Sequence, residues 1–229
     1  ATTENYTLGR SSAASDVYKR QPGQQGTAGG GKTLPGTRDR VRIRIMSSSY
    51  LTNPLEFLIT TLFSLYILAV MLRFILGAVR ADFYNPVSQF LVRITNPLLV
   101  PMRRFIPSIR QYDTSALLLM LVLQLISLAI VIMLRGASVS FPAMLLAAIG
   151  ELVILTFNVF IFAIVIQVVI SWINPGSYNP VNTLLHSITA PVLGPIQRLI
   201  PPVSGMDLSP LVALIGLQVL KMLVVPLLG

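Results

Sequence analysis

A segment of thirty-two residues occurs twice in this chain, 94 positions apart and without a gap, and this repetition constrains the fold more than any other feature. The two copies span residues 84–115 and 178–209, and fifteen of the thirty-two aligned positions are identical. The identical pairs include the triplet Tyr-Asn-Pro and the spaced pattern P-x-x-x-P-x-x-R-x-I-P. An internal repeat of this kind indicates that one structural unit has been duplicated.

Each copy lies between two long apolar runs. The chain is 54% hydrophobic and only 11% charged, whereas about a quarter of the residues in a soluble domain are charged. A helix needs about 20 mainly apolar residues to cross a bilayer. Four stretches reach that length, at roughly residues 55–79, 116–134, 152–173 and 208–228. We therefore predict an all-α membrane protein with four transmembrane helices, arranged as two hairpins with a Pro-rich connector in each.

This division gives three segments along the chain. Residues 46–135 form the first hairpin repeat and residues 136–229 the second, and a loop near residues 136–150 joins them. Residues 1–45 are rich in Gly, Ser, Thr, Gln and Pro without apolar periodicity, which predicts a disordered or artefactual leader. Residues 26–33 match the phosphate-loop pattern G-x-x-x-x-G-K-[ST], but neither a strand nor a helix is predicted beside them, so nucleotide binding is not expected.

The arginines predict the orientation in the membrane, because cytoplasmic loops carry an excess of Lys and Arg. The second connector carries Arg198, while the loop between the hairpins has only Arg135 at its border. Five arginines fall in the first connector: Arg80, Arg93, Arg103, Arg104 and Arg110. Both connectors are therefore predicted to face the cytoplasm, which makes the hairpins parallel repeats in a multi-pass protein of the cytoplasmic membrane.

Each connector begins with a helix-start signal. Asn85-Pro86 and Asn179-Pro180 place an Asn cap before a Pro at the first helical position. The apolar residues that follow fall on one face, which predicts an amphipathic helix of about ten residues lying along the membrane surface. The next prolines are predicted to end this helix, and they are Pro97 and Pro101 in one copy and Pro191 and Pro195 in the other.

Arg104 and Arg198 follow these prolines, where a guanidinium group could meet a lipid phosphate or a carboxylate such as Asp113 or Asp207. The connectors could anchor the protein at the membrane surface, or they could dock a partner or gate a substrate. The candidate docking or lipid-contact residues are Tyr84, Asn85, Pro86, Arg104, Pro107 and Asp113, with Tyr178, Asn179, Pro180, Arg198, Pro201 and Asp207 in the second copy.

Each apolar run also contains one long polar side chain at an aligned position. Arg73 aligns with Gln167, and Gln124 aligns with Gln218. All four are predicted to lie at a similar depth and could form one polar layer inside a four-helix bundle. Such a layer could hold the helices together by hydrogen bonds, or it could line a conduction or substrate site in which Arg73 sets the selectivity.

Catalytic chemistry is not predicted. The chain has no Cys, and its one His, His186, aligns with Val92 in the other copy. No metal site, cofactor or catalytic base is expected from this composition, and nucleic acid is not an expected partner. We predict that the protein is not an enzyme.

The Tyr-Asn-Pro triplet, the proline-arginine pattern and the run Val79-Arg80-Ala81-Asp82-Phe83 resemble the YggT family, called YlmG in some bacteria. The resemblance covers residue 46 to the end of the chain. It implies a small integral protein of the bacterial cytoplasmic membrane, with relatives in chloroplast thylakoids. It also implies roles in osmotic-shock tolerance, in cell division or chromosome distribution, or in assembly of the cytochrome b6 haem, and it brings no catalytic residues.

Two functional hypotheses remain open at this point. In the first, the protein is a membrane scaffold or assembly factor whose connectors dock a membrane or cytoplasmic protein through Arg104 and Arg198. In the second, it is a small transporter or channel for an ion or osmolyte, formed by a homo-oligomer and lined by the polar layer. The lipid bilayer is a partner in both.

Overall fold

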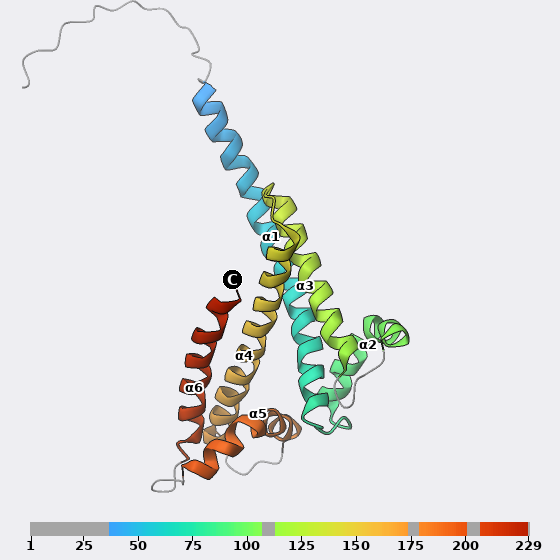
Figure 1. The fold of residues 1–229 in the computed structure, drawn as a ribbon, viewed down its shortest axis with the longest axis vertical. Helices are drawn as coiled ribbons and strands as arrows, with labels where there is room; N and C mark the ends of the chain where they lie inside the picture. Colours follow the sequence, from blue (N-terminus) through green and yellow to red (C-terminus); the bar gives the residue numbers. More distant parts are fainter. Residues whose placement is uncertain (1–36, 107–112, 174–178, 201–206, 229) are drawn as a thin grey trace, which may run out of the picture. The chain divides into compact units, whose positions relative to one another are not determined.

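The computed structural model describes residues 37–106, 113–173, 179–200 and 207–228, and the chain divides into the units Ala1–Ile45 and Met46–Gly229. The described residues form six α-helices and one short 3-10 helix (Figure 1). The α-helices are α1 (Thr37–Ala78), α2 (Pro86–Phe105), α3 (Thr114–Arg135), α4 (Phe141–Ile173), α5 (Pro180–Leu199) and α6 (Ser209–Val224), and the 3-10 helix η1 is Val225–Leu227.

Four helical spans among the described residues are long and apolar enough to cross a membrane. They are Thr52–Ala78, Thr114–Arg135, Phe141–Ile173 and Ser209–Leu227, with mean hydropathies between 2.0 and 3.0. No strand occurs in the described part of the chain. The prediction of an all-helical protein with four apolar spans is confirmed.

Two helices begin earlier than predicted. Helix α1 starts at Thr37, inside the segment predicted to be disordered, because no Gly or Pro interrupts residues 37–53. Helix α4 starts at Phe141, so the loop after α3 is much shorter than the predicted stretch 136–150. Pro142 occupies the first turn of α4, where a missing amide costs nothing. With 33 residues, α4 is about 50 Å long and exceeds the thickness of the hydrocarbon core.

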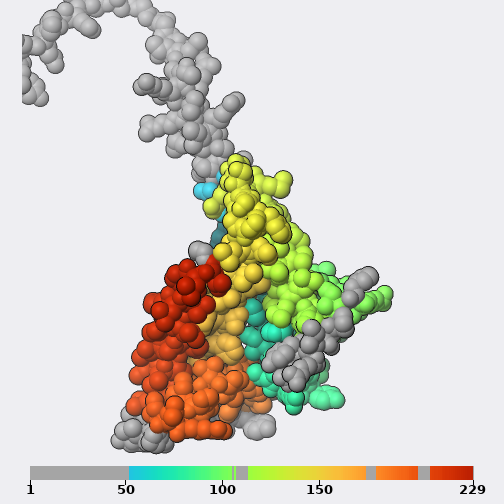
Figure 2. All heavy atoms as spheres, in the orientation of Figure 1, coloured from blue at the N-terminus to red at the C-terminus, as the bar shows by residue number. Residues whose placement is uncertain are grey.

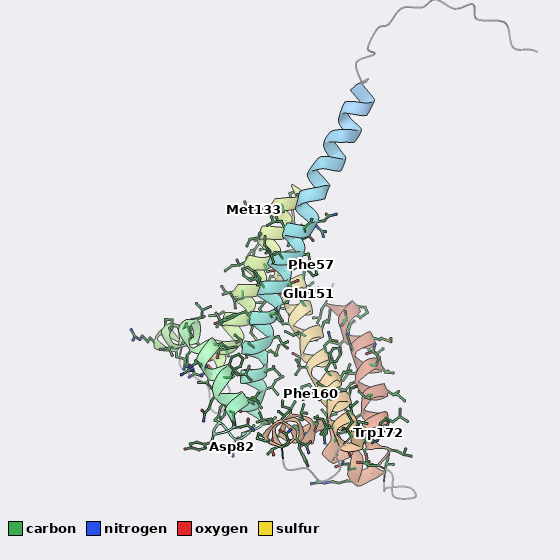
Figure 3. The ribbon with its side chains drawn as sticks, turned by 180° about the vertical axis from the view of Figure 1, so that it is seen from behind. Phe57, Asp82, Met133, Glu151, Phe160 and Trp172 are labelled. Carbon is green, nitrogen blue, oxygen red and sulfur yellow. The ribbon has the colours of Figure 1, made fainter. Side chains whose placement is uncertain are left out.

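The connectors are helices α2 and α5, which lie at one end of the second unit, here named the connector end (Figure 1). Each has 20 residues, and α5 begins 94 positions after α2. The Asn caps are confirmed: the Val87 amide donates to Asn85 Oδ1 at 2.9 Å, and the Val181 amide donates to Asn179 Oδ1 at 3.0 Å. Trp172 and Asp82 lie at this end, whereas Met133 lies at the opposite end (Figure 3).

The prediction that prolines end these helices is wrong. Pro97 and Pro101 lie inside α2, as Pro191 and Pro195 lie inside α5. All four are exposed, and a helix can bend away from an exposed proline at the cost of one hydrogen bond. The buried stripe on the opposite face explains why each helix continues, since it extends past the first proline: Leu91, Thr95 and Leu99 in α2, and Leu185, Thr189 and Leu193 in α5.

The main core joins α1 to α2, α3, α4 and α5. Its fully buried side chains include Ile67 and Val70 of α1, Leu99 of α2 and Met120 of α3. Helix α6 packs against α4 and α5 through a smaller cluster around Ala213. Figure 2 shows α6, in red, along one edge of the second unit, and most of its large apolar side chains are exposed there. Lipid tails are the environment in which such an apolar surface is stable.

Asn85 also links the two connectors, because its amide nitrogen donates to the Pro180 carbonyl at 2.7 Å. We predict that Asn85→Asp destabilises the protein by roughly 1–3 kcal/mol, because the carboxylate keeps the cap acceptor but leaves two acceptors facing each other. The matched control is Asn179→Asp. The side-chain nitrogen of Asn179 donates no hydrogen bond to another described residue, so this change removes only a cap amide without a partner. Thermal unfolding of the purified variants in detergent measures both effects, and equal shifts in Tm would contradict the link.

Candidate functional site

Arg73 of α1 fastens the first connector to the membrane helix. Its side chain is only 8% exposed. The Nη1 atom donates to Thr95 Oγ1 at 2.6 Å, to Asn96 Oδ1 at 2.8 Å and to the Val92 carbonyl at 3.3 Å. Thr95 in turn donates to the Leu91 carbonyl at 2.6 Å. One guanidinium nitrogen of this charged side chain is therefore bonded by the polar atoms of the adjacent connector helix.

The second copy contains the same junction without the charge. The Thr189 hydroxyl shares its hydrogen between Gln167 Oε1 and the Leu185 carbonyl, the latter at 2.9 Å. Gln167 and Thr189 are the residues 94 positions after Arg73 and Thr95. We name these two contacts the Arg73–Thr95 junction and the Gln167–Thr189 junction.

The four predicted layer residues are not joined to one another. Arg73 and Gln167 each bond to the connector that follows their own helix. Gln124 is half-buried in α3, and Gln218 is exposed on α6. Among the described residues, no hydrogen bond connects any two of the four. Arg73 and Gln167 therefore contact their own connectors, and a common depth for the four residues stays a prediction.

The aspartates that recur in both copies of the repeat do not pair with the predicted arginines. Asp113 Oδ2 pairs with Arg103 Nη2, and Asp207 Oδ2 accepts from Gln197 Nε2 at 2.9 Å. Each partner precedes the predicted arginine by one residue. One residue turns a helix by about 100°, so Arg104 and Arg198 point outward and are exposed. Their contact with a lipid phosphate stays a prediction.

The second aspartate is the more completely bonded of the two. Its Oδ1 atom accepts from the Ser209 amide at 2.8 Å. Hydrogen bonding by Ser209 is the largest cause that lowers the pKa of the Asp207 carboxyl, partial burial raises it by less, and the Gln197 hydrogen bond lowers it further. Asp113 Oδ1, by contrast, is buried and has no hydrogen-bond partner among the described residues.

The remaining predicted residues that the structure describes lie near the start of each connector. Tyr84 is 89% exposed, and its backbone amide donates to Asp82 Oδ1 at 2.8 Å. Asn85, Pro86, Asn179 and Pro180 form the helix starts already described. Three predicted residues lie outside the described part of the chain, and they are Pro107, Tyr178 and Pro201.

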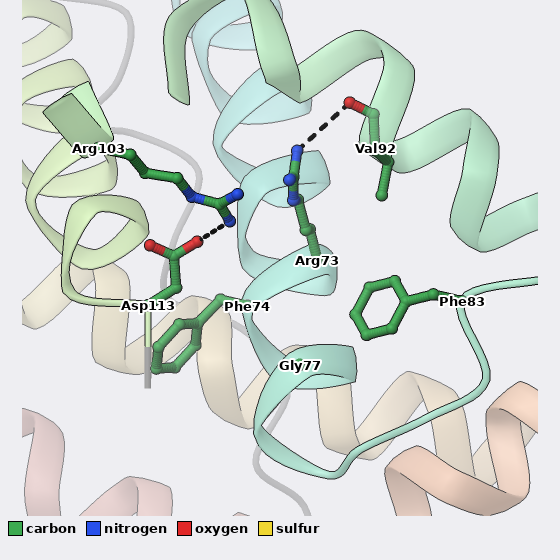
Figure 4. Close-up of a pocket in the computed structure, with 7 residues that line it drawn as sticks. All are labelled: Arg73, Phe74, Gly77, Phe83, Val92, Arg103 and Asp113. Atoms are coloured by element: carbon green, nitrogen blue, oxygen red, sulfur yellow. Dashed lines mark hydrogen bonds and ion pairs between the residues drawn. The ribbon is translucent and has the colours of Figure 1, made fainter. Parts of the chain in front are cut away.

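A polar pocket of about 310 Å³ opens between α1, α2 and the start of α3 (Figure 4). Arg73, Arg103 and Asp113 supply its charged groups. Phe74, Gly77, Phe83 and Val92 complete its walls. We name this space the arginine pocket. The sequence did not predict it, because Arg103 is not one of the identical positions of the repeat.

A second cavity, of about 450 Å³, is apolar and lies between the first and second halves of the protein. Its walls include Val87 and Leu91 of α2 and their counterparts Val181 and Leu185 of α5. Asn158 is the one polar residue in its lining, and Asn158 Oδ1 accepts from Lys221 Nζ at 2.7 Å. The sequence analysis did not predict this contact.

A protein-family model described as CCB3/YggT matches the chain twice, over residues 52–134 and 146–228. The chain belongs to the CCB3/YggT family. The resemblance identified from the sequence is therefore confirmed, and the two matches are offset by the same 94 residues as the repeated segment.

Individual relatives cover the same region. The chain is 45% identical over 171 residues to an uncharacterized protein of Pseudomonas aeruginosa, covering 74% of this chain and 87% of the relative. It is 40% identical over 179 residues to an uncharacterized protein of Vibrio alginolyticus, covering 77% and 96%. It is 34% identical over 172 residues to the uncharacterized protein YggT of Escherichia coli K12, covering 74% and 88%. No solved structure matches this CCB3/YggT chain.

The two junctions give a direct prediction about Arg73. Arg73→Leu should destabilise the protein by about 1.5–3 kcal/mol, because it removes the charged donor from Thr95 and Asn96. Arg73→Gln should cost less, because glutamine is the residue that contacts threonine in the other junction. Thermal unfolding in detergent separates the two variants. A Gln variant as unstable as the Leu variant would contradict the equivalence of the junctions.

Proposed function

We propose that the protein is a non-enzymatic membrane scaffold or assembly factor of the bacterial cytoplasmic membrane. In this proposal two parallel hairpins anchor the protein, and the connector helices dock a membrane or cytoplasmic protein. The observation that carries the proposal is the exposure of Arg104 and Arg198 at matching positions of α2 and α5. Neither arginine makes a hydrogen bond or ion pair with another described residue.

The distribution of charge supports a cytoplasmic position for the connectors. At the opposite end, Arg135 is held by Glu56 in a two-pronged pair, with Nε to Oε2 at 3.1 Å and Nη2 to Oε1. Its charge is therefore balanced locally. The connectors carry the exposed arginines Arg93, Arg104 and Arg198, which make no ion pair with another described residue, and Arg103, which pairs with Asp113. Within residues 46–229 the unpaired positive charge is therefore greater at the connector end, and such an excess favours the cytoplasmic side. The arginines at positions 38, 40, 42 and 44 precede the first span and act against this orientation.

The surface beside Arg198 has a shape that suits a protein partner. A shallow hollow of about 520 Å³ is lined by Arg198 and Leu199 together with Ala190, Pro191, Gly194 and Pro195 of α5. The two prolines and the glycine leave the helix surface free of long side chains, so a partner backbone could approach closely. A guanidinium at the edge of such a hollow can form a bidentate contact with an acidic side chain. We therefore propose an acidic partner segment.

The transporter hypothesis has less support. It requires Arg73, Gln124, Gln167 and Gln218 to line one path, but two of them are engaged with the connectors and Gln218 is exposed. Gln124→Leu and Gln218→Leu provide its test. Both variants should leave partner docking intact, and loss of ion or osmolyte flux in liposomes would favour a transporter.

The docking proposal is tested by chemical crosslinking in native membranes, followed by purification of the tagged protein and quantitative mass spectrometry. We predict a stoichiometric partner with the unmodified chain, and at least about a tenfold loss of that partner with Arg104→Glu/Arg198→Glu, because charge reversal turns a charge-assisted contact into repulsion.

Arg93→Glu is the matched control, because Arg93 is an exposed arginine of α2 that aligns with Ser187 rather than with an arginine. It should retain the partner. Recovery of homo-oligomers alone, or an equal loss with the control, would contradict docking through Arg104 and Arg198.

A further inference from the structure

The two halves of the protein provide an internal comparison for the arginine pocket. Gln167 and Gln197 stand 94 positions after Arg73 and Arg103. Gln197 donates to Asp207 as Arg103 donates to Asp113, whereas Gln167 contacts Thr189 by accepting from its hydroxyl. A neutral amide is therefore sufficient to hold a connector to its neighbouring helices. The positive charges of the first half are not required by that packing.

The two aspartates differ in how completely their carboxylate oxygens are hydrogen-bonded. Both carboxylate oxygens of Asp207 are bonded, one by Gln197 and the other by the Ser209 amide. In the first half only Oδ2 of Asp113 is bonded, by Arg103, and Oδ1 is buried without a partner among the described residues. A buried unpaired carboxylate oxygen costs free energy unless a donor reaches it. The first half thus has one acceptor that its own described side chains leave unused.

The pocket also has unused donors and enough room for a ligand. All three hydrogen bonds that Arg73 makes with described residues come from Nη1, so its Nε and Nη2 atoms have no partner among those residues. Arg103 is 43% exposed at its side chain. The volume of about 310 Å³ is at the lower end of the roughly 300–1,000 Å³ typical of small-molecule sites. With two arginines and one aspartate, the lining carries a net charge of +1.

We propose that the arginine pocket binds an anionic phosphate ester that also carries a hydrogen-bond donor. Arg73 and Arg103 would bind the phosphate oxygens, since guanidinium groups match phosphate geometry. A hydroxyl or ammonium group on the ester would donate to Asp113 Oδ1 once rotation of the carboxylate exposes that oxygen, which is buried in this structure. This binding is separate from partner docking, because neither Arg104 nor Arg198 lines the pocket.

The position of the pocket is compatible with two sources of this chemistry. Arg73 lies five residues, or about 7.5 Å, before the end of α1 at the connector end. Trp172 is 80% exposed at the same end, as expected for an aromatic residue at the membrane interface (Figure 3). A phospholipid headgroup and a water-soluble phosphate ester could both reach a site at this level.

Binding to the purified full chain in detergent tests the proposal with three probes. Dihexanoyl-phosphatidylglycerol is a lipid with hydroxyl donors, dihexanoyl-phosphatidylmethanol has the same charge without those donors, and glycerol 3-phosphate is a soluble ester with hydroxyl groups. Native mass spectrometry and calorimetric titration measure the affinities. We predict that at least one hydroxyl-bearing probe binds and that phosphatidylmethanol binds more weakly than phosphatidylglycerol. Selective binding of the lipid identifies a headgroup site, and selective binding of glycerol 3-phosphate identifies a soluble ligand.

The variants use the residues of the second half as replacements. Arg73→Gln and Arg103→Gln should each weaken binding by at least about tenfold, the effect of losing one charge-assisted hydrogen bond. Arg93→Gln removes one exposed charge from α2 outside the pocket and should leave affinity unchanged. Absence of binding by every probe, or an equal loss in Arg103→Gln and Arg93→Gln, would overturn the site. Equal affinity for the two lipids would overturn the role of Asp113.

Discussion

The contact between a polar residue inside a membrane helix and a threonine on the following connector organises each half of this protein. An apolar span cannot satisfy an arginine or a glutamine, and an unsatisfied polar group in hydrocarbon costs several kcal/mol. Placing Thr95 and Thr189 against Arg73 and Gln167 reduces that cost. It also fixes the connector helix against the preceding apolar helix, so the exposed face of the connector is determined by the buried contact.

The two halves share the same helix arrangement but differ in the charge of their polar side chains. Both connectors have an Asn cap, two exposed prolines and a buried threonine. The first half adds Arg73 and Arg103 where the second has neutral glutamines. Duplication can preserve a fold while one copy acquires a charge that packing does not demand. The pocket proposed for phosphate binding therefore has its arginines in the first half only. The outward-facing arginines proposed for docking, Arg104 and Arg198, occur in both halves.

Much of the architecture could be predicted from the sequence because the signals were local. Runs of apolar residues predicted the four spans, and Asn-Pro predicted both connector starts. The continuation of α2 past Pro97 was not predicted, because it depends on burial of Leu99 against the core, which is a tertiary effect.

The candidate site was predicted less well for a related reason. The repeat identified Asp113 and Arg104, yet the carboxylate bonds to Arg103. Identity between copies points to shared structure, whereas the groups lining the arginine pocket differ between the copies. Whether Arg103 or Arg104 meets the carboxylate depends on the rotation of α2 about its axis. The alignment of the two copies predicted a similar depth for Arg73 and Gln124, but it could not show that Arg73 bonds to its connector instead. These arrangements depend on the packing of whole helices.

Hydrogen exchange of the connector helices tests the central role of the junctions most directly. Thr95→Val and Thr189→Val keep the side-chain shape and remove only the hydroxyl. We predict faster amide exchange through α2 in the first variant and through α5 in the second, with the larger increase in α2 because its junction includes a charged donor. Unchanged exchange in both connectors, or an equal increase throughout the protein, would contradict the account.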